Sequence, residues 1–365
     1  MQQIPLTQPL FSGNEIDYVT DCLKTTWVSA GKYNERFEEK FAAFCNTTHA
    51  CTSSSGTSAL HMSAIALKIK SGDEVIVPDL TYVSSSNIVS YIGAKPVLVD
   101  VDRHVWTLDP SKIEEKITKK TKAIIVVHLY GHPTDMDKIN DIAKKYRLFV
   151  IEDACEAHGS LYKGKKAGSL SDVGCFSFSG AKIITTGEGG MVVSSNTALM
   201  DTIRAIQSNY MDNKRHFFHT DIGYPYRYSN LQAALGLAQL EKIDQLVDIK
   251  IKNAKLYNTF FKDIQAIQLP PDEPWAKSTF WLYGIVIKKP GLRDKLMQHL
   301  KEIGIQTRPF FASQHKLPMY KNKEKYPNSE YLSENGVCLP SGLILKPGDI
   351  EYICTEIIKF LKVYA

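Results

Sequence analysis

Short apolar runs alternate with stretches of helical periodicity along the first half of the chain. Four or five mostly apolar residues occur together at 74–77, 96–99, 123–127 and 148–152. Around them, apolar residues recur at helical spacing in four segments, residues 15–23, 34–44, 59–69 and 135–146. Strands that alternate with helices predict βαβ units. Because the strands are apolar almost throughout, the pattern predicts a mostly parallel sheet that is covered on both faces.

The pattern changes after residue 190. The run 191–193 predicts a strand that pairs with the preceding one through a glycine-rich turn. A long amphipathic helix is expected to begin near Asn230 and to continue past Leu246, where it would connect two parts of the molecule.

The C-terminal part predicts strands at 280–287 and 307–311 and helices at 292–303 and 349–361, with Asp349 as the N-cap of the last helix. We therefore expect an α/β protein with two domains. The large domain, residues 1–248, would hold the mostly parallel sheet, and residues 249–365 would form a small α+β domain.

Composition narrows the class of protein. Of the 365 residues, 44% are hydrophobic and 23% are charged, which fits a substantial core and excludes global disorder. The net charge of +5 comes from dispersed lysines and arginines, so no nucleic-acid partner is expected.

The seven cysteines argue against two kinds of site. Their number is odd and no C-x-x-C pair occurs, so neither a disulfide framework nor a metal site is expected. Reduced thiols, the lack of a signal peptide and the lack of a bilayer-length apolar run predict a cytoplasmic protein without a membrane partner.

One lysine and one aspartate carry the strongest chemical signal. Lys182 stands between the strand-like run 176–179 and the glycine-rich turn 187–190, and Asp153 follows the run 148–152. An amine that reacts with an aldehyde and a carboxylate that keeps a pyridine nitrogen protonated are the minimum equipment for pyridoxal phosphate (PLP) chemistry. Either residue alone would be read as a surface lysine or a helix cap. Together they are more specific, because each follows a predicted strand, where open α/β sheets bind ligands.

A phosphate site is predicted at Ser55-Gly56-Thr57-Ser58, where a helix begins. Free backbone N–H groups at a helix N-terminus suit a dianion. Gly56 would permit close approach, and the Thr57 hydroxyl could donate a hydrogen bond.

These motifs resemble those of the DegT/DnrJ/EryC1/StrS sugar aminotransferases, a branch of the fold type I PLP enzymes, and the likeness extends from Gln8 to the C-terminal helix. The resemblance implies that Lys182 is the lysine that bonds to the cofactor. It also implies that Tyr82 stacks on the pyridine ring, that Glu156 lies near the ring hydroxyl, and that Ser177 is a second phosphate donor. A buried core tyrosine is the plain alternative for Tyr82.

Within the family, the chain resembles members that aminate C4 of a nucleotide-linked 4-keto-6-deoxyhexose to give perosamine- or viosamine-type sugars for glycans. The resemblance implies L-glutamate as amino donor and a nucleotide-diphosphate sugar as acceptor, GDP-linked as first choice and dTDP- or UDP-linked next. Four residues are candidates for substrate contacts, namely Trp27, Ser29, Arg227 and His315.

The family also implies a homodimer with active sites at the subunit interface. One departure affects this expectation, because Pro225 stands where the family has an asparagine that reaches the cofactor phosphate of the neighbouring subunit. Proline has neither a side-chain amide nor a backbone donor, so that contact must be missing or replaced.

Three other functions remain open. One is a PLP-dependent sugar dehydratase, although the family members of that kind have histidine in place of Lys182. Another is a non-catalytic protein that binds PLP or a sugar nucleotide. An NAD-binding protein is a weaker alternative, because no G-x-G-x-x-G follows the first strand.

Overall fold

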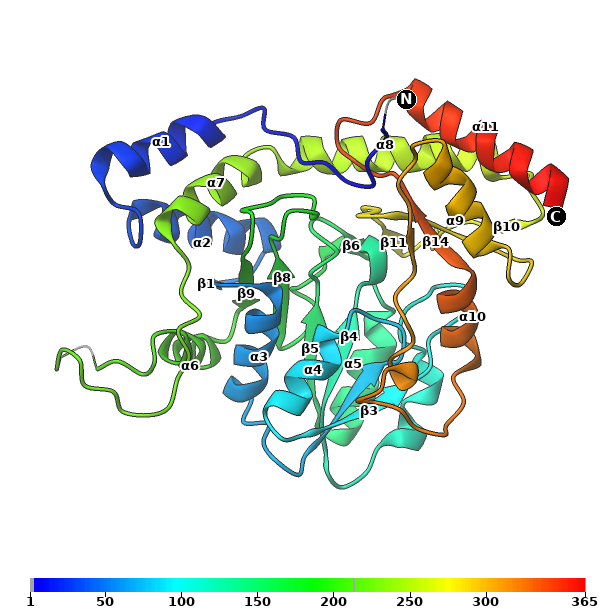
Figure 1. Cartoon of the computed structure of the whole chain (residues 1–365). Coiled ribbons are helices and arrows are strands. Elements are labelled where there is room, and N and C mark those ends of the chain that lie inside the picture. The colour runs from blue at the N-terminus through cyan, green and yellow to red at the C-terminus, as the bar shows by residue number, and fades with distance from the viewer. Residues whose placement is uncertain (1–2, 213, 365) are drawn as a thin grey trace.

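A seven-stranded sheet lies at the centre of the computed structural model, which describes residues 3–212 and 214–364 (Figure 1). Its strands in spatial order are β1 (His49–Ser53), β9 (Gly190–Ser194), β8 (Val173–Ser177), β5 (Phe149–Asp153), β4 (Thr121–Val127), β2 (Glu74–Pro78) and β3 (Lys95–Val99). Strands β8, β5, β4, β2 and β3 are parallel, whereas β9 is antiparallel to β1 and β8. The mostly parallel sheet and the pairing of the strand after residue 190 are thus confirmed.

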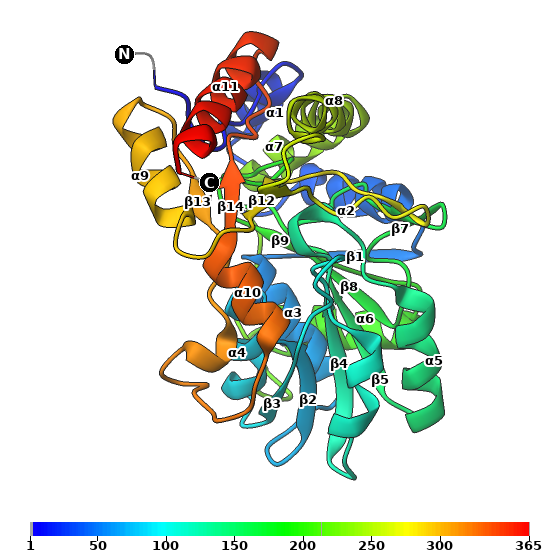
Figure 2. The same ribbon diagram turned by 90° about the vertical axis from the view of Figure 1, so that its right-hand side faces the viewer.

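The strands are apolar because their side chains contribute to two hydrophobic clusters, one on each face of the sheet. Successive side chains of a strand point to opposite faces of the sheet. In β4, Ala123, Ile125 and Val127 therefore pack into one buried cluster and Ile124 and Val126 into another. The first cluster includes residues of α3 and the second includes residues of α5, and Figure 2 shows these helices on opposite sides of the sheet.

The first six helices are α1 (Glu15–Thr25), α2 (Lys32–Cys45), α3 (Gly56–Ala66), α4 (Ser84–Tyr91), α5 (Met136–Tyr146) and α6 (Thr197–Gln207). Of these, α2 to α6 pack against this sheet, whereas α1 packs against the later helix Asn230–Leu240. Helix α3 is apolar on all sides and packs across β8 and β9, which explains its almost complete burial.

The expected long helix after residue 230 is in fact two helices, α7 (Asn230–Leu240) and α8 (Ile243–Phe261). The break at Glu241 and Lys242 contains no glycine or proline, so the local sequence gives no stop signal. At this break the chain contacts the start of α1. The Glu241 carboxylate accepts hydrogen bonds from Asn14 Nδ2 at 2.8 Å and from the Tyr18 hydroxyl at 2.9 Å.

The C-terminal part has its own antiparallel sheet. It consists of β10 (Ile267–Gln268), β12 (Tyr283–Ile287), β14 (Gly336–Leu339) and β13 (Arg308–Pro309), with helices α9 (Arg293–Glu302), α10 (Pro327–Asn335) and α11 (Pro347–Tyr364). A third, small sheet joins β11 (Ala276–Lys277), β6 (Leu161–Tyr162) and β7 (Lys165–Lys166).

Helix α11 begins earlier than expected. Asp349 lies in its first turn and not at the N-cap, because Pro347, whose φ suits the first helical position, begins the helix. The predicted domain boundary between residues 248 and 249 falls within α8 and stays a prediction.

No helix within the described ranges combines the length and the apolar character that a membrane span requires.

Candidate active site

A cavity of about 310 Å³ lies where the parallel strands β2, β4, β5 and β8 reach their carboxyl ends. Open α/β sheets bind ligands at this edge. The cavity is lined by all seven residues that the sequence assigned to the cofactor, Gly56, Thr57, Tyr82, Asp153, Glu156, Ser177 and Lys182.

Lys182 lies in the turn that follows β8, and its side chain is 10% exposed. Its Nζ is 3.9 Å from Glu156 Oε1 and 3.7 Å from the centre of the Trp281 ring. The indole is fixed beside the lysine because Trp281 Nε1 donates a hydrogen bond to the carbonyl oxygen of Ala181 at 2.6 Å. The amine is therefore held inside the cavity between a carboxylate and an aromatic face.

Asp153 ends β5, and its carboxylate is buried. Oδ2 accepts a hydrogen bond from the Ser85 hydroxyl at 2.8 Å, and Oδ1 accepts one from the backbone N–H of Cys155 at 3.2 Å. Two donors that come from different elements fix the orientation of the carboxylate. This arrangement suits a group that holds a proton on the ring nitrogen of a bound cofactor.

Glu156 lies in the loop that follows Asp153 and β5. Its Oε2 accepts a hydrogen bond from the backbone N–H of Tyr130 at 2.7 Å. Burial raises the pKa of Glu156 to about 7, against the opposing effects of the Lys182 charge and of that hydrogen bond. The side chain is thus poised between its charged and neutral forms near neutral pH.

The predicted phosphate cradle opens α3. Ser55 and Ser58 form a reciprocal capping box, with Ser58 N–H to Ser55 Oγ at 3.0 Å and Ser55 N–H to Ser58 Oγ at 2.8 Å. A Cβ atom at Gly56 would stand 2.7 Å from Cys155 Sγ and 2.8 Å from Ser177 Cβ. Only glycine fits this close approach.

The hydroxyl groups near the cradle complete a donor set for an anion. Thr57 Oγ1 lies 2.7 Å from Ser84 Oγ, and Ser177 lines the same cavity. Hydroxyl and N–H donors at a helix N-terminus are suited to a phosphate dianion. The lysine, the buried carboxylate and this cradle therefore fit PLP.

Tyr82 is not a core residue, since it is 56% exposed and lines the cavity. Its ring centre lies 5.7 Å from that of Phe311. The alternative of a buried tyrosine is excluded, and the side chain is accessible to a planar ligand.

The four candidates for substrate contacts lie outside this cavity in the single chain. Trp27 and Ser29 are exposed between α1 and α2, and Arg227 is exposed just before α7. His315 is buried, with Nδ1 2.8 Å from Asp79 Oδ2 and Nε2 3.3 Å from Glu330 Oε1. These pairs connect the segment after β13 to the end of β2 and to α10.

Sequence reasoning missed three residues of the cavity and its wall, namely Ser85, Tyr130 and Trp281, and it assigned no role in the cavity to Arg308 and Phe311, which also line it. None of them belongs to a motif with a recognisable spacing relative to Lys182. Tyr130 links two of the walls, because its N–H binds Glu156 and its hydroxyl accepts from the backbone N–H of Phe311 at 3.1 Å.

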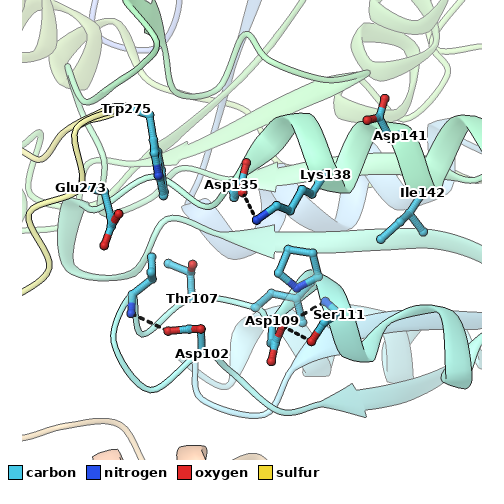
Figure 3. A pocket seen from close by; sticks show the side chains of 13 residues that line it. Asp102, Thr107, Asp109, Ser111, Asp135, Lys138, Asp141, Ile142, Glu273 and Trp275 are labelled. Carbon is cyan, nitrogen blue, oxygen red and sulfur yellow. Dashed lines mark hydrogen bonds and ion pairs between the residues drawn. The ribbon is translucent and has the colours of Figure 1, made fainter.

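A second hollow, with five acidic residues among the thirteen that line it, lies on another part of the molecule (Figure 3). Three of its five acidic side chains have partners within the chain. Asp135 pairs with Lys138 at 2.9 Å, and Asp109 accepts from the Ser111 hydroxyl at 2.7 Å. Asp102 accepts from the backbone N–H of Val105 at 2.9 Å. Asp141 and Glu273 line the same hollow, and among the described residues no group of three or more His, Cys, Asp or Glu side chains could hold a metal ion.

Comparison with known proteins places the chain among aminotransferases. The DegT/DnrJ/EryC1/StrS aminotransferase family model matches residues 10–358. The chain is 44% identical over 362 residues to a GDP-perosamine synthase of Escherichia coli O157:H7, with 99% of each chain covered. It is 40% identical over 360 residues to a GDP-perosamine synthase of Caulobacter vibrioides, with 97% of each covered. Its structure matches the PLP-form of Spr1654, a candidate sugar aminotransferase of Streptococcus pneumoniae, with a TM-score of 0.94, 27% identity and full coverage of both chains.

Proposed function

Because this chain belongs to the DegT/DnrJ/EryC1/StrS aminotransferase family and is a PLP-dependent sugar aminotransferase, we propose that it transfers the amino group of L-glutamate to C4 of a nucleotide-linked 4-keto-6-deoxyhexose. The product would be a perosamine- or viosamine-type nucleotide sugar, with GDP as the first choice of nucleotide. The observation that carries the proposal is the likeness to GDP-perosamine synthases over nearly the full chain, together with one cavity that holds Lys182, Asp153 and the cradle at Gly56.

Each of these residues has a distinct task in the proposed reaction. PLP supplies an electron sink and carries the amino group between the two substrates. Lys182 moves the proton at the carbon that loses or gains the amino group. Asp153 holds the proton on the cofactor's ring nitrogen, and Glu156 orients the ring from the side of its hydroxyl. The cradle at Gly56 and Thr57, with Ser177, anchors the phosphate, while Tyr82 covers the ring.

The substrate proposal predicts a specific transfer of nitrogen. Purified enzyme with PLP and glutamate that carries a heavy nitrogen isotope is expected to aminate a 4-keto-6-deoxyhexose linked to GDP, dTDP or UDP. The products are identified by mass, and the isotope must appear in the sugar. Amination of only a 3-keto sugar or an unactivated cyclitol ketone would contradict the substrate class but leave the PLP assignment intact.

We also propose a cytoplasmic homodimer, in agreement with the seven free thiols of the chain. The segment between α6 and α7 projects from the body of the molecule (Figure 1) and exposes Phe217 by 80% and Ile222 by 84%. Apolar side chains on a projecting segment favour burial against another surface. The same segment reaches the cradle, because the backbone N–H of Ser54 donates to the Tyr226 carbonyl at 3.1 Å.

Light scattering is expected to give the mass of two chains at working concentration. The double variant Phe217→Asp, Ile222→Asp should shift the protein toward the monomer and reduce activity, because charge would be placed in the contact. Met319→Asp is the matched control, since Met319 is also exposed but lies elsewhere on the chain. A fully active wild-type monomer would refute the proposal.

A further inference from the structure

Asp79 is a buried residue that directly follows β2, and its partners come from the C-terminal part of the chain. Oδ1 accepts a hydrogen bond from the backbone N–H of His315 at 2.8 Å, and Oδ2 lies 2.8 Å from Nδ1 of the same residue. The backbone carbonyl of Asp79 accepts a hydrogen bond from the N–H of Gln314 at 2.7 Å. Two adjacent residues therefore bind both the side chain and the main chain of Asp79.

The contact continues along both segments. Gln314 Nε2 donates a hydrogen bond to the carbonyl oxygen of Thr81 at 2.9 Å. Further on, the Tyr320 hydroxyl donates to Asn87 Oδ1 of α4 at 2.6 Å, and Figure 2 shows the segment that leads into α10 beside α4. The segment between β13 and α10 is thus bonded at several points to the chain that runs from the end of β2 into α4.

That stretch of chain carries three groups of the cofactor site. Tyr82, which lines the cavity, comes just before α4, and Ser84 and Ser85 lie in the first turn of the helix. Ser84 Oγ lies 2.7 Å from Thr57 Oγ1 of the cradle, and the Ser85 hydroxyl donates to Asp153 Oδ2 at 2.8 Å. The contacts at the end of β2 therefore hold the entry to α4, from which one side chain faces the cavity and two others bind the cradle and the carboxylate.

Stability alone does not account for a buried pair of this kind. Removal of two charged groups from water offsets much of their attraction, so a buried ion pair adds little to the free energy of unfolding. Burial indeed raises the pKa of Asp79, against the opposing hydrogen bonds from His315. What a fully bonded pair provides is a single geometry, because its donors and acceptors fit in one arrangement. The geometry that it fixes here is the position of the chain before α4.

We propose that His315, acting through Asp79, is a positioning residue for the cofactor, an inference that rests on the roles proposed for Tyr82 and Asp153. His315 does not line the cavity and touches no reacting group. The pair holds the entry to α4 so that Tyr82 covers the ring of PLP and Ser85 orients Asp153. Loss of the pair should therefore loosen the cofactor without removal of any group that binds it directly.

Two variants of His315 separate the two contacts of its ring. The amide nitrogen of asparagine can replace Nδ1 and keep the bond to Asp79, whereas that of glutamine can replace Nε2, which lies 3.3 Å from Glu330 Oε1. His315→Gln is expected to weaken PLP binding by on the order of 10-fold and to change the visible circular dichroism of the bound cofactor. His315→Asn should restore both properties to near those of the wild type.

Asp79→Asn should resemble His315→Gln, because one of the two donors of His315 would then face an NH₂ group. Asp100→Asn is the matched control. Asp100 is also buried, directly follows the neighbouring strand β3, and accepts a hydrogen bond from the C-terminal part, from the N–H of Ser329 at 2.8 Å. No residue between β3 and β4 lines the cavity, so this control should melt at a lower temperature but bind PLP as the wild type does.

A milder variant decides the matter if loss of the pair prevents folding. Gln314→Met leaves no charge without a partner and removes only the hydrogen bond to the Thr81 carbonyl. We expect it to weaken PLP binding by about 3-fold. Each purified protein is dialysed to release PLP and then titrated with it, and thermal unfolding of the same samples shows that the fold is kept.

Three outcomes would overturn the inference. They are lower melting temperatures with unchanged PLP affinity and unchanged circular dichroism in all variants of residues 79, 314 and 315, an equal loss of PLP affinity in Asp100→Asn, and equal losses in the two His315 variants. Failure of the proposed amino transfer is distinguishable, because the PLP measurements use no substrate. An enzyme that aminates no nucleotide sugar would still report on His315.

Discussion

Lys182→Ala is expected to abolish amino transfer, with a loss on the order of 10³- to 10⁴-fold or more. Alanine can neither bond to the cofactor nor move the proton at the reacting carbon, and no other lysine lines the cavity among the described residues. Absorption spectra should show that the visible band of the lysine-bound cofactor is lost, and a product assay should show no aminated sugar.

The control for this variant is Lys166→Ala. Lys166 Nζ lies 4.1 Å from the centre of the Phe44 ring, so this change also removes an ammonium group from an aromatic face, but away from the cavity. It should retain the visible band and the activity. Circular dichroism of both variants would show that the fold is kept. Normal transamination by Lys182→Ala would remove the central assignment.

Asp153→Asn is expected to fold and to bind PLP but to lose activity by on the order of 10²- to 10³-fold. Asparagine keeps the shape of the side chain, but a neutral amide cannot stabilise a protonated ring nitrogen as a carboxylate does. Its NH₂ group would also face a donor, either the Ser85 hydroxyl or the Cys155 N–H. Steady-state rates with glutamate and the keto sugar, together with the cofactor content of the purified variant, provide the measurement.

Two further variants show whether charge or position matters at Asp153. Ser85→Ala removes one hydrogen bond to the carboxylate and keeps its charge, so its loss should be much smaller. Asp172→Asn is the matched control, because Asp172 also accepts a backbone hydrogen bond from β5, from Val150 at 2.8 Å at the other end of the strand. Near-wild-type rates for Asp153→Asn would show that Asp153 only caps the turn after the strand.

The sequence was sufficient to predict the large sheet and the groups at its edge. A run such as Ala123 to Val127, apolar at every position, is stable only as a strand buried on both faces, and it was predicted as one. Asp153 is the last residue of β5, and Lys182 lies in the turn that follows β8. Parallel strands end at the same edge, so strand order and local sequence together bring these two residues to one cavity. The roles of the two side chains stay predictions until the variants are measured.

Local sequence patterns predicted the structure less well where it depends on contacts between residues that are distant in sequence. No residue near Glu241 marks the end of α7, where Asn14, just before α1, and Tyr18 of α1 both donate hydrogen bonds to Glu241. His315 was expected to contact substrate, yet the fold buries it against Asp79 and Glu330.

The walls of the cavity were decided by the tertiary structure alone. Ser85 contacts Asp153 and Tyr130 contacts Glu156. Trp281, which precedes β12, lies against Lys182, and Arg308 of β13 lies near the Trp281 ring. The spacing of apolar residues indicates which face of a strand or helix is buried, because that spacing is set within a single element. It does not report which remote side chain meets that face, because this depends on how separate elements pack. The sequence by itself therefore determined that Lys182, Asp153 and Gly56 lie where parallel strands end, whereas the packing of the C-terminal part against the large sheet decided which other side chains surround them.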